Sequence, residues 1–169
     1  LTSWYNDKFA DTDIRSVTAA VMSVTAVGTG LSVSGPLLSL LMEADGMSSA
    51  MIGANTAVSG VAAMLAVPFA TPLARSIGVV NAIALNVLIA AAVLISFYYT
   101  DPIPDWFILR FIFSINLSMV FVLSEFWINY SANEKNRGII LGIYGTVLGL
   151  GFASGPAIVS IIGIDGFLP

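Results

Sequence analysis

The stretch that decides the fold runs from Asp105 to Arg137 and reads DWFILRFIFSINLSMVFVLSEFWINYSANEKNR. Its apolar part is long enough to cross a bilayer, because about 20 apolar residues span the hydrocarbon core. Two charged side chains, Arg110 and Glu125, interrupt it, and charges are costly at that depth. A short polar loop with Lys135 and Arg137 then follows. We therefore expect the chemistry of this chain to be concentrated here.

The composition of the whole chain is that of a membrane protein. Of its 169 residues, 57% are hydrophobic and only 9% are charged, whereas a soluble domain carries roughly 25% charged residues. The sequence contains no His and no Cys, which argues against disulfides, thiol nucleophiles, zinc sites and Ser–His dyads. We accordingly expect no enzyme, no metal, no cofactor and no nucleic-acid partner.

Charge-free intervals divide the chain into five predicted membrane spans. They cover about 16–42, 47–74, 79–99, 106–129 and 138–164. Each span should be a helix, because every backbone amide in the hydrocarbon must be paired internally. The sequence therefore predicts an all-α, polytopic membrane helix bundle over residues 16–164. Residues 1–15 are expected to form a terminal segment, and residues 165–169 the start of a loop on the opposite side.

The distribution of charged residues predicts an orientation. With five spans, one side of the membrane receives the basic residues Lys8, Arg15, Arg75, Lys135 and Arg137. The other side receives the acidic residues Glu43, Asp45, Asp101, Asp105 and Asp165. Because basic loops stay in the cytoplasm, the N-terminal segment 1–15 is predicted to be cytoplasmic and residues 165–169 extracytoplasmic.

Three places in the sequence resemble one transporter family. Leu109–Arg110 places an arginine early in the fourth span, and Phe121–Gly145 reads FVLSEFWINYSANEKNRGIILGIYG. Gly151–Pro156 reads GFASGP. The first resembles the fourth-helix motif of the major facilitator superfamily, the second resembles the junction of helices 4 and 5 in a bacterial permease subgroup, and the third is similar to the front of a fifth-helix motif of drug–proton antiporters. The chain thus resembles the first five of twelve helices in that superfamily.

Other positions depart from the family pattern. The loop after helix 2 usually reads Gly-x-Leu-Ala-Asp-Arg-x-Gly-Arg-Arg in the family, and here it reads TPLARSIGVV over residues 71–80. Arg75 stands where the acid is expected, and Gly78 is retained. In the fifth span Val159 and Ser160 replace the trailing pair of glycines, and the first span contains no acid.

The resemblance implies a secondary active transporter in a bacterial inner membrane. Such a protein moves a small organic molecule by alternating access, here with proton coupling and with efflux favoured by the fifth-helix motif. Its partners would be the lipid bilayer, the small-molecule substrate, protons and the remaining helices of a longer chain. The alternative from a different class is a non-transporting membrane scaffold or partner subunit.

Polar residues of the first and fourth spans are the candidate cavity lining. These residues are Arg110, Asn116, Thr29 and Ser32. For Arg110 the sequence leaves two interpretations open. The side chain faces a cavity and contacts substrate, as the resemblance implies, or it extends along the helix to the outer headgroups. Asn55, Asn86 and Asn116 are expected to form hydrogen bonds between helices.

Glu125 is the acid within the predicted spans and the candidate for proton coupling. It follows Arg110 by fifteen residues, which places the two roughly 60° apart around the helix and about 22 Å apart along it. One interpretation is a proton carrier, because burial would raise the pKa of its carboxyl towards neutrality. The other is a structural lock, in which Glu125 pairs with Arg75, Lys135 or Arg137.

Glycine and proline residues are candidates for gating or for close packing. In the first span they are Gly35 and Pro36, and in the fifth span they are Gly151, Gly155 and Pro156. Small residues let membrane helices approach closely, and proline interrupts the hydrogen-bond ladder and bends a helix. Arg75 and Gly78 are the candidate residues of the cytoplasmic loop.

Overall fold

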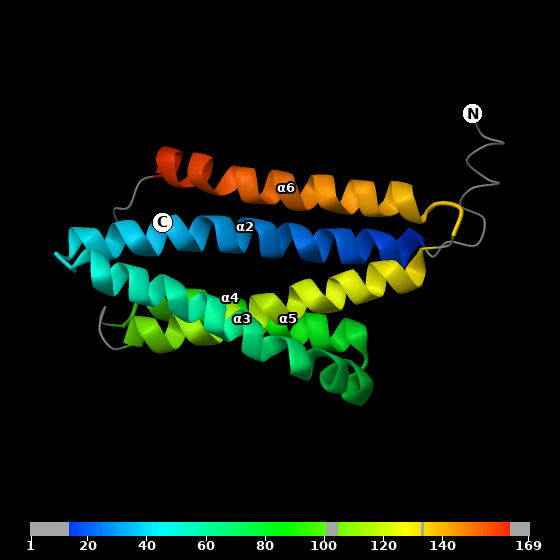
Figure 1. Ribbon diagram of the computed structural model, residues 1–169, viewed down its shortest axis with the longest axis horizontal. Helices are drawn as coiled ribbons and strands as arrows, with labels where there is room; N and C mark the ends of the chain where they lie inside the picture. The colour runs from blue at the N-terminus through cyan, green and yellow to red at the C-terminus, as the bar shows by residue number, and fades with distance from the viewer. Residues whose placement is uncertain (1–13, 101–104, 133, 163–169) are drawn as a thin grey trace.

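The computed structural model describes residues 14–100, 105–132 and 134–162. Within these ranges the chain forms five helices, each long and apolar enough to cross a membrane (Figure 1). They are α2 (Ile14–Ala44), α3 (Ser49–Ile77), α4 (Val79–Phe97), α5 (Asp105–Ser131) and α6 (Arg137–Ile162). The predicted all-α membrane bundle is confirmed. The expected terminal segment, apart from Ile14 and Arg15, and the expected loop 165–169 lie outside the described residues.

The helix ends differ slightly from the predicted spans. Ile14 and Arg15 form the first turn of α2 instead of belonging to the terminal segment. Asp105 begins α5, where a carboxylate interacts favourably with the helix dipole. At the same end of the bundle, α3 begins after Ser48, whose hydroxyl accepts a hydrogen bond from the backbone N–H of Met51.

A single glycine connects α3 to α4. Gly78 has a φ of 84°, and its backbone N–H donates to the carbonyl of Ala74 at the end of α3. Side chains with a Cβ rarely adopt that backbone conformation, so a glycine is required at this position. The candidate loop residue Gly78 therefore has a structural task, which is to reverse the chain without intervening residues.

Helices α2 and α5 form the centre of the bundle. α2 packs against α6 on one side and α5 on the other, and α5 also packs against α3 and α4. Figure 1 shows α6 and the group of α3, α4 and α5 on opposite sides of α2. In the most apolar part of α5, 50% of the residues are buried, compared with 17–28% in the most apolar parts of the other described helices. α5, which contains the opening stretch of sequence, is therefore the most enclosed helix.

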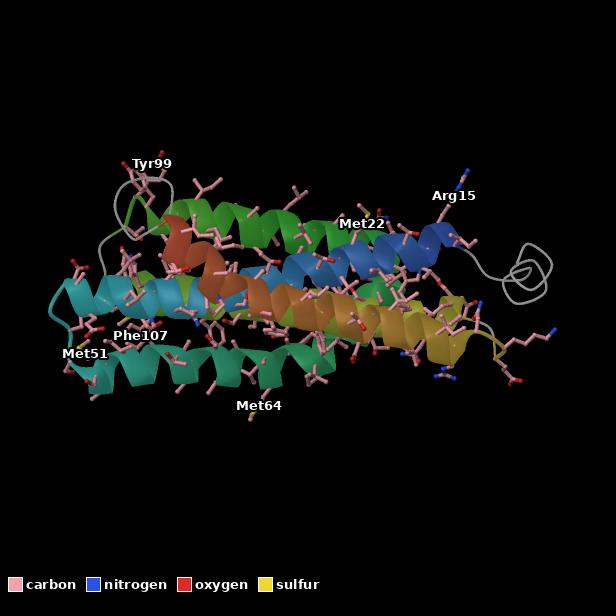
Figure 2. The ribbon with its side chains drawn as sticks, turned by 90° about the horizontal axis from the view of Figure 1, so that it is seen from above. Arg15, Met22, Met51, Met64, Tyr99 and Phe107 are labelled. Atoms are coloured by element: carbon pink, nitrogen blue, oxygen red, sulfur yellow. The ribbon has the colours of Figure 1, made fainter. Side chains whose placement is uncertain are left out.

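The outer surface of the bundle is apolar, as a lipid-facing surface requires. Large exposed hydrophobic side chains occur on every described helix, including Met22, Met64, Leu88, Ile108 and Leu150. Figure 2 shows Met64 projecting away from the bundle and places Arg15 and Tyr99 at opposite ends. Successive helices run in alternating directions (Figure 1), as in an integral membrane protein with short connections.

Glycines bring the backbones of α2 and α6 into direct contact. A Cβ added to Gly28 would lie 3.2 Å from the Cα of Gly151, and one added to Gly155 would overlap the backbone of Ser32. The hydroxyl of Ser32 donates to the carbonyl of Gly151 over 2.9 Å. Pro36 has no backbone N–H, so it leaves the carbonyl of Ser32 outside the ladder of α2. We name this contact, formed by Gly28, Ser32, Gly151 and Gly155, the glycine seam.

Candidate functional site

Arg110 lies at the meeting point of three helices. It is the sixth residue of α5 and is 6% exposed. Its Nε donates to the Oγ of Ser59 on α3 over 2.7 Å, and its Nη1 donates to the backbone carbonyl of Ser34 on α2 over 2.9 Å. Both hydrogen bonds are directed into the bundle. The guanidinium is thus held between α2, α3 and α5 and takes its orientation from two fixed acceptors.

A second polar contact supports the same interface one turn away. The side-chain amide of Asn55 on α3 donates to the backbone carbonyl of Trp106 on α5 over 3.4 Å. Asn55 precedes Ser59 by four residues, as Trp106 precedes Arg110, so each pair lies on one helix face. Trp106 is buried, and its ring packs edge-to-face against Phe97 with centroids 6.0 Å apart. We name Asn55, Ser59, Trp106 and Arg110 the polar seam.

The guanidinium of Arg110 has hydrogen-bonding capacity to spare. It carries five N–H donors, of which two are used by Ser59 and Ser34. Its Nη2 atom has no hydrogen-bond partner among the described residues. This atom is also not completely shielded from solvent. A Cβ added to Gly35 would lie 3.7 Å from Nη2. Outside the backbone of α2 itself, Nη2 is the one atom within 4 Å of that position among the described residues, so the candidate residue Gly35 lies beside the unbonded nitrogen.

The remaining candidate cavity residues have other contacts. Asn116 is buried, and its amide donates to the carbonyl of Ile112 on its own helix over 2.7 Å. Ser32 faces α6 across the glycine seam, whereas Ser34, roughly 200° further around α2, faces Arg110. Thr29 is half-buried, and its backbone carbonyl lies 3.1 Å from the Ser32 hydroxyl, whose one proton it shares with the carbonyl of Gly151. The structure does not bring these hydroxyls and the Asn116 amide into hydrogen bonds with Arg110.

Asn55, Asn86 and Asn116 were expected to form hydrogen bonds between helices, and one of the three does so among the described residues. Asn55 reaches across from α3 to α5. Asn86 donates instead to Ala82 on its own helix over 2.7 Å, as Asn116 does to Ile112. Both of these residues are buried. Each finds the backbone carbonyl one turn earlier, which satisfies a donor without a neighbouring helix.

Glu125 is exposed near the end of α5 that is opposite to Arg110. Among the described residues it forms no ion pair with Arg75, Lys135 or Arg137. Arg137 donates instead to the side chain of Asn129 over 2.7 Å. The lock suggested by the sequence is therefore not formed in this structure. Whether Glu125 carries a proton stays a prediction.

Sequence reasoning did not identify a neighbour of Glu125 on α6. Tyr144 is buried, its hydroxyl has no hydrogen-bond partner in the described part of the chain, and it lies within electrostatic range of Glu125. A buried hydroxyl without a partner is uncommon, so Tyr144 retains an unused donor on α6. The sequence offered no signal for it, because Tyr144 and Glu125 lie on separate helices.

The other candidate residues are placed as follows. Gly151 and Gly155 form the glycine seam with α2, while Pro36 and Pro156 lie on exposed parts of their helices. Arg75 is exposed in the last turn of α3, where a basic side chain interacts favourably with the helix dipole. These positions establish close packing for the two glycines. A gating role for any of them stays a prediction.

Comparison with known proteins identifies the family. The model of the Major Facilitator Superfamily matches residues 20–167 of the chain. YfkF of Bacillus subtilis (strain 168), described as an uncharacterised MFS-type transporter, is 31% identical over 134 residues. The alignment covers 79% of this chain and 34% of YfkF, so the chain spans about a third of the length of the relative. No solved structure gives a significant match.

The match includes all three places in which the sequence resembles this family, and it covers almost the whole helical bundle. It agrees with the expectation that the chain is part of a membrane transporter and not an enzyme. The chain belongs to the Major Facilitator Superfamily.

Proposed function

We propose that this chain forms the first five helices of a secondary active transporter that moves a small organic molecule by alternating access. In this proposal α2 to α6 belong to a six-helix N-terminal half, which rocks against a second half around a site near the bilayer midplane. The observation that carries the proposal is Arg110. It is a buried cation in an apolar bundle, oriented by α2 and α3, with donors left for a bound molecule.

The positions of the basic residues support an orientation. The start of α2, the end of α3 and the start of α6 carry Arg15, Arg75 and Arg137. The end of α2 and the start of α5 carry Glu43 and Asp105. By the positive-inside rule the N-terminus lies in the cytoplasm. The relative in Bacillus subtilis supports a bacterial inner (plasma) membrane as the location.

Proton coupling is assigned to Glu125 in this proposal. Its carboxylate is exposed on the bundle, free of the nearby basic residues, and within electrostatic range of the Tyr144 hydroxyl. A group in this position can exchange a proton with the aqueous phase. Efflux is the direction that the GFASGP segment of α6 favours, by its resemblance to the antiporter motif.

The full-length protein, reconstituted in liposomes that contain a pH-sensitive dye, tests the proposal. Addition of a transported molecule should move protons, and an imposed pH gradient should drive its accumulation. Glu125→Gln keeps the size of the side chain but cannot release a proton, so gradient-driven flux should fall to the level of empty liposomes. Exchange of substrate without a gradient should persist.

Glu134→Gln is the matched control, because Glu134 is an exposed acid in the connection before α6. This variant should transport as the wild type does. Unchanged gradient-driven flux in Glu125→Gln would remove Glu125 as the proton carrier. A full-length protein that moves none of a broad panel of small molecules would favour the scaffold alternative.

Arg110→Ala tests the residue that carries the proposal. Hydrogen bonds to a charged group contribute about 1.5–3 kcal/mol, so loss of this contact should weaken substrate binding by about 10-fold to 100-fold. The variant should still insert and purify as a monodisperse protein. Normal binding and transport in Arg110→Ala would leave Arg110 a purely structural residue.

A further inference from the structure

The positive charge of Arg110 has no counter-charge in the described part of the molecule. The acids of this part are Glu43, Asp45, Asp105, Glu125 and Glu134, and none forms an ion pair with Arg110. Four of them lie at helix ends or in connections, and Glu125 lies about 22 Å away along the same helix. An unpaired charge is costly in an apolar interior. A compensating negative group is therefore expected at this position.

We propose that Arg110 binds the acidic group, a carboxylate or a phosphate, of the molecule that the protein transports. This assignment of a substrate class rests on the transport function proposed above. Guanidinium groups bind these two acids through pairs of parallel N–H donors. The acid supplies the negative charge that α2, α3 and α5 do not.

The contacts of Arg110 leave one side of the guanidinium available. Ser59 and the Ser34 carbonyl hold Nε and Nη1, so they fix the plane of the group before any ligand arrives. The two donors of Nη2 remain, and Nη2 lies beside Gly35, where a Cβ would meet no other atom within 4 Å among the described residues outside α2's own backbone. Both acceptors are neutral, so neither offsets the charge. The arrangement orients the cation and leaves its charge for an anion.

Two kinds of molecule could supply the acidic group that binds Arg110, and the experiment has to distinguish them. A soluble organic acid and the phosphate of a membrane lipid offer the same oxygens to Arg110. Arg110 is close to the end of α5, so both can approach. The hydrogen bonds of Arg110 run inward to α2 and α3, which favours a molecule bound between the helices over a headgroup at the surface. The test therefore contains a lipid arm.

The experiment measures thermal unfolding of the full-length protein in a neutral detergent. The probes are benzoate, succinate, citrate and phenyl phosphate, each with an uncharged counterpart of similar shape, such as benzamide for benzoate. At least one acid should raise the Tm by about 2 °C or more when it is well above its Kd, and its uncharged counterpart should not. Arg110→Gln should abolish this rise, and Arg110→Lys should retain part of it.

Two further comparisons complete the test. Arg15→Gln makes the same change at an exposed arginine at the start of α2, and it should respond to acids as the wild type does. Without ligand, Arg110→Gln should be at least as stable as the wild type, because it removes an unpaired buried charge. If a carboxylate elsewhere in the full-length protein pairs with Arg110, this variant would strand that carboxylate and unfold at a clearly lower temperature.

The outcomes distinguish this proposal from the transport proposal. If no acid raises the Tm, if the uncharged counterparts act equally, or if Arg110→Gln is strongly destabilised without ligand, acid recognition by Arg110 is wrong. Stabilisation by phosphatidylglycerol alone, dependent on Arg110, would identify a lipid site and overturn the substrate assignment. If the protein transports only neutral or cationic molecules, the transport proposal stands and the proposal that Arg110 binds an acidic substrate is wrong. If acids bind at Arg110 but no molecule is transported, the transport proposal is wrong and the acid-binding site remains.

Discussion

The two sides of α2 are held by different physical means. On the α6 side, at the glycine seam, backbone atoms of Gly28 and Ser32 lie directly against Gly151 and Gly155. On the α5 side, one long side chain, Arg110, connects α2 and α3 to α5. At Gly155 the glycine seam has no room for even a Cβ atom, whereas the polar seam has unused donors. We infer that the first contact fixes the position of α2 and that the second is available to respond to a ligand.

The glycine seam is the contact between helices that an added methyl group should disturb most. Gly155→Ala adds a methyl group that would overlap the backbone of Ser32, which has no flexible end to move aside. Overpacking of this kind costs about 1–3 kcal/mol or more, and about 2–4 °C of Tm corresponds to each kcal/mol in a chain of this size. We expect the largest loss of thermal stability among these variants, measured by unfolding in detergent.

Gly145→Ala is the control for that substitution. Gly145 lies on the same helix, and a Cβ added there meets no atom within 4 Å among the described residues. Its Tm should change little, or rise slightly because alanine favours the helix. Equal melting temperatures for the two variants would show that α2 and α6 are not in backbone contact at Gly155.

Ser59→Ala tests how the polar seam orients Arg110. It removes the acceptor of Arg110 Nε without touching the charge, so the guanidinium should lose its fixed orientation. A hydrogen bond to a charged group contributes about 1.5–3 kcal/mol. Because Arg110 keeps its bond to Ser34, about 1–2 kcal/mol of this should be lost from ligand binding, so the affinity for the acid that best stabilises the wild type should fall about 5-fold to 30-fold. Ser59 acts here as a positioning residue, so KM should rise much more than kcat falls.

Two variants check the interpretation of Ser59. Ser59→Thr keeps the hydroxyl and should restore most of the affinity. Ser76→Ala removes an exposed hydroxyl of the same helix that bonds the carbonyl of Leu73 over 2.9 Å, and it should behave as the wild type. A Ser59→Ala protein with unchanged affinity would mean that Ser34 alone orients Arg110.

The contrast between the seams also explains which features the sequence could reveal. The five helices follow from charge-free intervals, because hydrocarbon enforces internal backbone pairing over a known length. The importance of Arg110 follows from its cost in an apolar span. The partners of Arg110 do not follow, because Ser59 and Ser34 are separated from it by 51 and 76 residues.

Hydroxyl and amide side chains in membrane helices have a local alternative that the sequence does not exclude. Thr56 and Ser96 bond the carbonyl four residues earlier in their own helices, whereas Ser59 bonds across to Arg110. Asn86 and Asn116 choose the local carbonyl and Asn55 does not. The choice depends on which neighbour faces the side chain after packing. Residue type and spacing therefore identified polar positions but not their partners.

The smallest effect is expected at the other end of the polar seam. Asn55→Ala removes the amide that donates to Trp106 over 3.4 Å, a long hydrogen bond between two neutral groups. A neutral hydrogen bond contributes about 0.5–1.5 kcal/mol, and this one should lie at the lower end, with a fall in Tm of about 1–2 °C. Asn81→Ala, at an exposed amide of α4 that donates to the carbonyl of Ile77, the last residue of α3, is the matched control and should not change the Tm. If Asn55→Ala lowered the Tm as much as Gly155→Ala does, the polar seam would determine helix position as strongly as the glycine seam, and the division of roles between the two sides of α2 would be wrong. A small loss of Tm with unchanged acid affinity would restrict Asn55 to packing and leave ligand recognition to the turn that contains Arg110.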